Sequence, residues 1–315
     1  MPAKSKPKTR KIPPPRRRQC GAMTVHSRLL EQYPDFRQNL VNLERQVSQR
    51  LMLGIVSKVG GPTRISVVVH VVFNTASENI STAQIKSQTA ALNKDYAAKN
   101  ADRNQTPSVW KGLIANPNVQ FALATKDPDG KPTNGITRTQ TARASFTDDD
   151  KVKSAATGGA DPWPSNRYLN LWVCTFEATP TGQLLGYAQF PGGPPGTDGV
   201  VILNTAFGTK GTAAAPFNKG RTATHEIGHW LNLHHIWGDT QHCEGTDLVD
   251  DTPNQQLPNF SKPHFPHITC HNGPNGDMFM NYMDYVDDAA MFMFTSGQVA
   301  RMTATLEGPR SGIGT

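Results

Sequence analysis

The stretch HEIGHWLNLHHIWG at residues 225–238 constrains this chain more than any other, because it places four histidines and a glutamate within one short segment. His225 and His229 are four residues apart, so a helix would present both imidazoles on one face, one turn apart, where they can bind one metal ion. Glu226 lies beside the first histidine and can reach a water on that metal. Zinc lowers the pKa of such a water, and the glutamate can take its proton as the water attacks a carbonyl. The pattern therefore predicts a zinc site with Glu226 as general base.

A catalytic zinc needs a third protein ligand, and the sequence offers several. The downstream glutamates are poor candidates, because Glu244 lies in a Cys/Gly-rich loop and Glu307 is close to the end of the chain. His234, His235 and Asp239 remain. His235 is favoured, since it follows the second histidine by six residues, as in the pattern HExxHxxGxxH. In that case His234 points away from the metal, and Asp239 is the weaker alternative.

Asn232 stands at the glycine position of that pattern. There the chain turns in a left-handed conformation, so that the third ligand swings back towards the helix. Asparagine is the next most tolerant residue in this conformation, so we expect the turn to form. Further along, NYMDY at 281–285 supplies Met283 for a methionine turn beneath the metal. The two patterns together are much more specific than either one alone.

Composition and charge indicate a globular body with a basic tail. The chain has 315 residues, of which 37% are hydrophobic and 18% charged, so a packed core is feasible. Residues 1–18 carry eight of the basic residues and no acid, which leaves a net charge of −1 for the rest of the chain. We expect this tail to be a disordered, solvated arm; contact with nucleic acid or a membrane surface is the alternative. No apolar run is long enough to span a bilayer, and no secretory signal is visible.

Periodicity predicts an α/β fold with a mixed sheet. Residues 24–53 have a helical pattern that Pro34 breaks into two helices. A further helix is expected at 82–99, and a last one from Thr295, where a hydroxyl and Gln298 fit a capping box. The predicted strands share β-branched or apolar runs and lie at 65–75, 119–125, 168–176, 184–190 and 199–204.

The four cysteines do not form a CxxC motif, so a zinc ribbon is not indicated. Cys174 lies in an apolar run and is expected to be a buried thiol. Cys243 and Cys270 flank a Pro/Gly/Asn-rich stretch, where a disulfide would close a long loop. Such a bond implies an oxidising compartment.

The chain resembles the pappalysin family of metzincin proteases in six segments, which are RQCG (18–21), YLNLWVC (168–174), GYAQFPGG (186–193), HEIGHWLNLHHIWGD (225–239), DLVDDTPNQ (247–255) and NYMDY (281–285). The resemblance covers nearly the whole chain. It implies a metzincin catalytic domain with a mixed twisted sheet, an active-site helix and a methionine turn, preceded by a helical pro-segment.

The resemblance also implies roles for individual residues. Zinc would be held by His225, His229 and His235, and Tyr285 would help to stabilise the oxyanion. The edge strand Gly186, Tyr187 and Ala188 would pair with an extended peptide. The bond between Cys243 and Cys270 matches a family disulfide, whereas a second family disulfide has no counterpart here.

Two further sites follow from the same resemblance. Calcium would be bound after the zinc helix by Asp247 and Thr252 side chains and by backbone oxygens near Thr246 and Val249. Members of the family cut before Arg or Lys, using an aspartate at the floor of the S1′ pocket. Asp288 is the matching position here, and Asp287 is the neighbouring alternative.

Latency is the last implication. Cys20 would ligate the zinc in the latent form, so that residues 1–57 would be a basic tail and pro-segment and residues 58–315 the catalytic domain. The bond Ser57–Lys58 would be a self-cleavage site. These features predict a monomeric, secreted or extracellular zinc endopeptidase that acts on proteins or peptides, with no membrane partner and no nucleic-acid partner in the mature form. The rivals are a metal-binding domain without catalysis, against which the intact Glu226 speaks, and a nucleic-acid-associated protein acting through residues 1–18.

Overall fold

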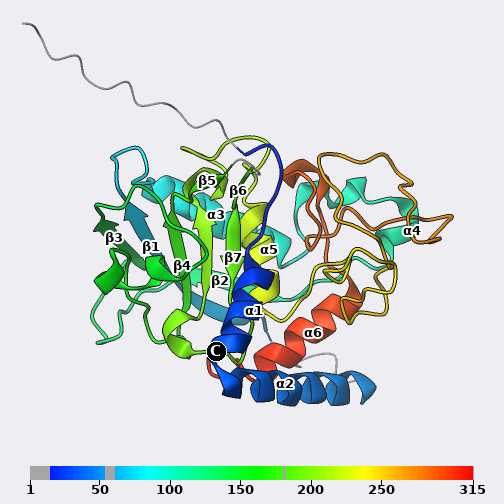
Figure 1. Cartoon of the computed structure of the whole chain (residues 1–315), viewed down its shortest axis with the longest axis horizontal. Coiled ribbons are helices and arrows are strands. Elements are labelled where there is room, and N and C mark those ends of the chain that lie inside the picture. The colour runs from blue at the N-terminus through cyan, green and yellow to red at the C-terminus, as the bar shows by residue number, and fades with distance from the viewer. Residues whose placement is uncertain (1–14, 54–60, 180–181, 315) are drawn as a thin grey trace, which may run out of the picture.

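The computed structural model describes residues 15–53, 61–179 and 182–314. A six-stranded mixed sheet occupies the left half of the molecule in Figure 1, with strands in the order β2-β1-β4-β8-β7 and with β3 paired to the C-terminal half of β1. All pairs are parallel except β7 with β8, so β7 forms an antiparallel edge. The strands span β1 Thr63–Phe73, β2 Val119–Leu123, β3 Ile136–Gln140, β4 Leu169–Cys174, β7 Gly186–Ala188 and β8 Val200–Leu203, and a separate small ribbon pairs β5 Ala178–Thr179 with β6 Gly182–Gln183.

The central strands are almost entirely buried, as expected for parallel strands that are covered on both faces. On one face their Val, Ile and Leu side chains share a core with α3 (Thr82–Asp95) and α5 (Arg221–Trp230). On the other face, Trp172 of β4 and Tyr187 of β7 share a second core with Phe190 and with apolar residues of α1 (Ala22–Gln32). Helix α5 therefore packs on one face of the sheet, next to the edge strand β7.

Two elements enclose this body at its ends. Helix α2 (Pro34–Met52) lies alongside α6 (Ser296–Glu307) in the lower part of Figure 1. Residues 239–294 are mostly irregular and are tied by a disulfide between Cys243 and Cys270. The remaining helices are short: α4 Ser108–Lys111 and 3-10 turns at Ala101–Gln105, Lys151–Lys153, Ala155–Thr157, Pro195–Thr197, Asn204–Ala206 and Asp288–Ala290.

Most predicted elements are confirmed, with bounds that are shortened or shifted by a few residues. Pro34 divides the N-terminal helices as expected, because proline is well suited to the first turn of a helix and here begins α2. The capping box at Thr295 forms, and the disulfide predicted between Cys243 and Cys270 is present. Strand β3 was missed, since its sequence ITRTQ is polar and half exposed. Within the described ranges, no helix is long and apolar enough to cross a membrane.

The prediction that residues 1–18 are a disordered arm is wrong for residues 15–18. Arg18 is 1% exposed, because its guanidinium is bound inside the molecule. Residues 1–14 and the expected cleavage bond Ser57–Lys58 lie outside the described residues.

Candidate metal centre

The metal centre is built on α5 and on the turn that ends it. Asn232 has a φ of +73°, and this left-handed residue closes the helix with two hydrogen bonds. Its N–H donates to the carbonyl of His229, and the N–H of Leu233 donates to the carbonyl of Gly228, each at 2.9 Å. This is the Schellman arrangement that glycine usually terminates. Asparagine is thus compatible with the turn, as predicted, and the chain reverses in time to return His235 to the helix.

Three imidazoles converge at one point. The Nε2 atoms of His225, His229 and His235 lie 3.0–3.3 Å from one another, and all three rings are buried. Each Nδ1 faces an oxygen: the carbonyl of Tyr282 at 2.7 Å, the carbonyl of Leu233 at 2.7 Å and the carboxylate of Asp239 at 2.5 Å, respectively.

The hydrogen bonds of the Nδ1 atoms determine which ring nitrogen of each histidine can bind a metal. Because each Nδ1 donates its proton to an oxygen, each Nε2 presents a lone pair towards the other two. Three buried acceptors that face one another need a cation between them. Their spacing also fits a small ion, since metal–nitrogen bonds of about 2.1 Å in a tetrahedral site separate the nitrogens by about 3.4 Å. Burial, followed by the charge of His235, holds the pKa of His225 and His229 well below the ordinary value, so both are neutral ligands.

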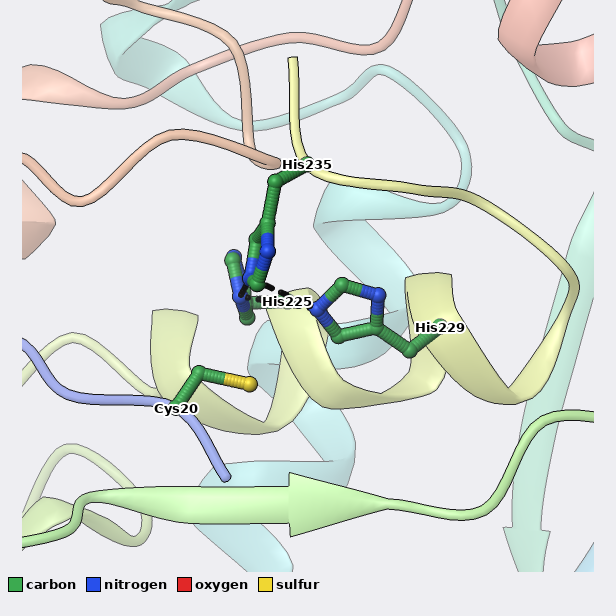
Figure 2. Close-up of side chains that lie close together, drawn as sticks. All are labelled: Cys20, His225, His229 and His235. Atoms are coloured by element: carbon green, nitrogen blue, oxygen red, sulfur yellow. Dashed lines mark hydrogen bonds between the residues drawn. The ribbon is translucent and has the colours of Figure 1, made fainter. Parts of the chain in front are cut away.

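Cys20 completes the cluster from the N-terminal segment (residues 15–53). Its Sγ and the three imidazole nitrogens all lie within 4.8 Å of one another, and Figure 2 shows the thiol directed at the imidazoles. The same sulfur lies 3.3 Å from Oε2 of Glu226. Burial raises the pKa of Glu226 to about 8, and burial together with this glutamate raises that of the thiol. Four ligand atoms and one buried carboxylate therefore share a single dry site.

The floor and the wall of the centre are supplied by the methionine turn. Met283 is fully buried beneath α5, and a Cβ added at Gly228 would lie only 2.5 Å from its sulfur. Glycine at this helical position therefore makes room for the methionine. Tyr285 lies beside the ligands, with its ring centroid 4.9 Å from that of His235, and its hydroxyl donates to the carbonyl of Cys20 at 3.5 Å.

The edge strand β7 is already paired in this structure. The N–H of Gly21 donates to the carbonyl of Gly186, and the N–H of Leu185 donates to the carbonyl of Gln19, both at 2.9 Å. The pairing is parallel. A Cβ at Gly186 would lie 2.9 Å from Cγ of Glu226, so the strand passes directly against the carboxylate. An extended chain bound to β7 is thereby held over Glu226.

Asp288 holds an arginine. Its Oδ1 accepts from Nη2 of Arg18 at 2.7 Å, while its Oδ2 accepts from the backbone N–H groups of Lys219 and Arg221 at 2.7 and 3.3 Å. Both charged side chains are buried. Asp287, the neighbouring alternative, is half-buried and does not pair with Arg18.

The rest of the guanidinium is also bound. Arg18 donates to the Thr222 hydroxyl at 3.1 Å and to the Val286 carbonyl at 3.3 Å, and it lies over the Phe217 ring. We call these groups, with Asp288, the Asp288 seat. Arg18 was not predicted as a site residue, because it was assigned to the basic tail. Its place in the segment RQCG, two residues before Cys20, was the one available signal.

The remaining predicted residues fall into two groups. Asp239 and His234 are not in the ligand cluster: Asp239 orients His235, and His234 packs against Phe190, with ring centroids 5.1 Å apart. Asp247 and Thr252 lie together, since the Thr252 hydroxyl is 2.9 Å from both carboxylate oxygens and from the carbonyl of Val249. The Thr246 hydroxyl instead accepts from the N–H of Leu248.

Comparison with known proteins agrees with this site. Residues 147–307 match the peptidase family described as Pregnancy-associated plasma protein-A. An extracellular metalloprotease from Pyricularia oryzae is 34% identical over 257 residues, which cover 79% of this chain and 76% of the relative. A second, from Arthroderma otae, is 30% identical and covers 79% of each chain.

Two solved structures from Tannerella forsythia are similar over most of the fold. A promirolysin mutant superposes with a TM-score of 0.84 at 45% identity and covers 94% of this chain and 97% of its own. Mature mirolysin in complex with a cleaved peptide has a TM-score of 0.78 at 49% identity, covering 81% and 96%. With its cluster of metal-ligand side chains, methionine turn and mixed sheet, this chain belongs to the pappalysin family of metzincins and is a metalloendopeptidase.

Proposed function

We propose that the chain is a zinc endopeptidase, made as a zymogen, that cuts proteins and peptides on the N-terminal side of Arg or Lys. The observation that carries the specificity is the Asp288 seat, in which a buried carboxylate holds the guanidinium of Arg18. Arg18 lies two residues from Cys20, whose sulfur is at the metal centre. The Asp288 seat therefore lies close enough to the metal centre to receive a side chain next to the bond that is cut.

The chemistry follows from the groups around the centre. Zinc, held by the three histidines, would polarise the scissile carbonyl and lower the pKa of a water. Glu226 would accept a proton from that water at the oxygen that now contacts Cys20 and deliver it to the leaving nitrogen. The Tyr285 hydroxyl would stabilise the developing negative charge. Strand β7 would hold the peptide extended, through the backbone groups that now bind Gln19 and Gly21.

Latency has a simple physical basis in this arrangement. Cys20 occupies the position where a water must stand beside Glu226, and a thiolate is a strong zinc ligand. The Asp288 seat and the β7 edge are filled by the same short segment. We propose that residues up to 57 form the pro-segment, that residues 58–315 form the catalytic domain, and that the chain cuts itself between Ser57 and Lys58.

The specificity is tested with a pair of matched variants. Activated wild-type enzyme should cleave peptides with Arg or Lys after the cut bond, and Asp288→Asn should lose that preference by about two orders of magnitude, because a buried carboxylate–guanidinium contact is lost. Asp287→Asn changes the neighbouring half-buried carboxylate and should keep the preference. A zinc chelator should abolish all cleavage. An unchanged cleavage pattern in Asp288→Asn would remove this residue from the specificity site.

We also propose a calcium ion at the loop after the zinc helix. Burial raises the pKa of Asp247 to about 7, and this carboxylate has no ion-pair partner among the described residues. The Thr252 hydroxyl and the Val249 carbonyl, both hard oxygen ligands, lie beside it. Calcium should raise the melting temperature of the wild type and not that of Asp247→Asn. Asp250→Asn, at an exposed acid of the same loop, is the control; an equal calcium response in all three proteins would reject the site.

An extracellular location is proposed on two grounds. Relatives over most of the chain are named extracellular metalloproteases. The disulfide between Cys243 and Cys270 suits an oxidising compartment. We propose that the enzyme acts there as a monomer; detection of the processed chain only inside cells would contradict this assignment.

A further inference from the structure

The N-terminal segment passes the metal centre in one direction. Arg18 lies on one side of Cys20, and α1 begins on the other side and crosses in front of β7 and α5 (Figure 1). If the Asp288 seat takes the side chain that follows the cut bond, the surface under α1 takes the residues that precede it. The inference below rests on the proposed function in this one respect.

An acidic side chain borders the first residue on that side. A Cβ added at Gly21 would lie 3.4 Å from Cβ and Oδ2 of Asp148 and 3.2 Å from Cβ of Tyr187, which belongs to the edge strand. Among the described residues the Asp148 carboxylate forms no ion pair. A substrate chain that replaced Gly21 would therefore pass next to an uncompensated carboxylate.

Two residues further, Asp150 binds an arginine of α1. Nη2 of Arg28 donates to Oδ2 of Asp150 at 2.7 Å and to the backbone carbonyl of Asp148 at 2.9 Å. This site is therefore defined by the guanidinium that it holds, and not by its acids alone. Both oxygens accept from the same guanidinium nitrogen, so they form one acceptor site for a basic side chain, and the charge of that side chain strengthens both hydrogen bonds.

The catalytic body holds this site in place without help from α1. Asp150 has a φ of +63°, and its Oδ1 is 2.8 Å from Nζ of Lys153, a buried lysine that also donates to the carbonyl of Thr197. Lys153 in turn lies 4.9 Å from the centroid of the Tyr187 ring, under the edge strand. Loss of α1 would leave Oδ2 of Asp150 and the Asp148 carbonyl without their donor, while the rest of the site remains.

We propose that Asp148 and Asp150 form a second specificity site, which favours basic side chains on the N-terminal side of the cut bond. The preferred substrates are then peptides with a basic residue after the bond and another within the few residues before it. The N-terminal segment occupies both sites with its own arginines, Arg18 and Arg28.

The test uses the full chain, activated by limited proteolysis and separated from its N-terminal segment. Every peptide carries Arg after the cut bond, and each of the four preceding positions is varied among Arg, Ala and Glu. We expect at least one position at which Arg exceeds Glu about five- to tenfold in kcat/KM, the size typical of a partly exposed ion pair. Asp148→Asn and Asp150→Asn should reduce this ratio, and high salt should reduce it in the wild type.

Asp149→Asn is the matched control, because Asp149 belongs to the same run of acids but pairs with Lys151 at 2.6 Å. It should keep the wild-type ratio. If Asp150→Asn fails to fold because Lys153 loses its partner, Asp148→Asn alone decides the test. Equal rates for Arg and Glu at all four positions, or the same ratio in all three variants, would overturn the proposal. A parallel set of peptides with Ala in place of the Arg after the bond tests the proposed function separately: equal cleavage of both sets, with selectivity before the bond retained, would count against the proposed function alone.

Discussion

The N-terminal segment meets the catalytic body in two regions that differ in kind. Residues 18–20 precede α1 and bring Arg18 and Cys20 into contact with Asp288, Glu226 and the three histidines of the ligand cluster. Helix α2 lies along α6 and reaches none of these groups; its Leu43 and Val47 pack against Ala304.

The α2 region nevertheless has an indirect connection to the metal centre. Glu44 accepts from Arg301 of α6 and from Nδ2 of Asn232, the turn residue that returns His235 to the cluster. Burial alone would raise the pKa of Glu44, but the hydrogen bonds and charge of Arg301 outweigh it and hold the pKa below its ordinary value. The comparison teaches that the first region both covers the catalytic groups and docks through a buried ion pair, whereas the second region docks on α6 through a partly exposed ion pair and an apolar face.

The largest expected effect separates chemistry from docking. Glu226→Ala should lower kcat/KM of the activated enzyme by a factor of about 10²–10⁴, the range for loss of a general base. The N-terminal segment should stay docked, because Arg18 and Glu44 keep their partners. Peptide cleavage measures the first effect, and protection of the full-length chain from chymotrypsin measures the second. Exposure of α1 and α2 in this variant would show that the two regions are not separable.

Arg18→Ala should give the next largest effect. It leaves Asp288 buried and uncompensated, which should weaken docking of the N-terminal segment by about 3 kcal/mol. In a Glu226→Ala background, which prevents self-cleavage, residues 15–21 should become accessible to protease while α2 stays protected. Arg18→Lys should recover part of the loss. Equal exposure of both regions would mean that docking is a single cooperative event.

Glu44→Gln should have a smaller effect. The Glu44 side chain is 32% exposed and its partner Arg301 only 3%, so we expect a loss of about 1 kcal/mol in docking. Protection of α2 from protease should fall, and activation of the otherwise wild-type chain should begin earlier. Gln38→Ala, on the exposed side of the same helix, is the control. Unchanged protection in Glu44→Gln would assign the affinity of α2 to its apolar face alone.

Acid should produce the smallest of these effects, through the same carboxylate. The pKa of Glu44 is lowered by docking, so the carboxylate stabilises docking fully above its ordinary pKa of 4.5, and this contribution is lost as the pH falls through the lower pKa of the docked state. Protection of α2 should therefore decrease below about pH 4.5, and less so in Glu44→Gln. Protease protection of α2, measured as a function of pH in both proteins, checks this prediction. An identical decrease in both proteins would assign the effect to other groups.

The sequence predicted correctly those strands that are buried on both faces. Strands β1, β4 and β8 are continuous apolar runs because both of their faces are covered. Strand β3 escaped detection because it is polar and is held chiefly by pairing with β1. Such pairing depends on a partner far away in the chain, which no local pattern encodes.

The same division applies to the site. By itself, the sequence determined the cluster of His225, His229 and His235, because spacings of four and six residues need only a helix and one left-handed turn to bring the three rings together. Only the tertiary structure decided which carboxylates hold which arginines. Arg18 and Asp288 are 270 residues apart, and Arg28 and Asp150 are 122 apart. A buried charge selects its partner by proximity in the folded molecule, and that proximity exists only once the sheet, α1 and the methionine turn are assembled.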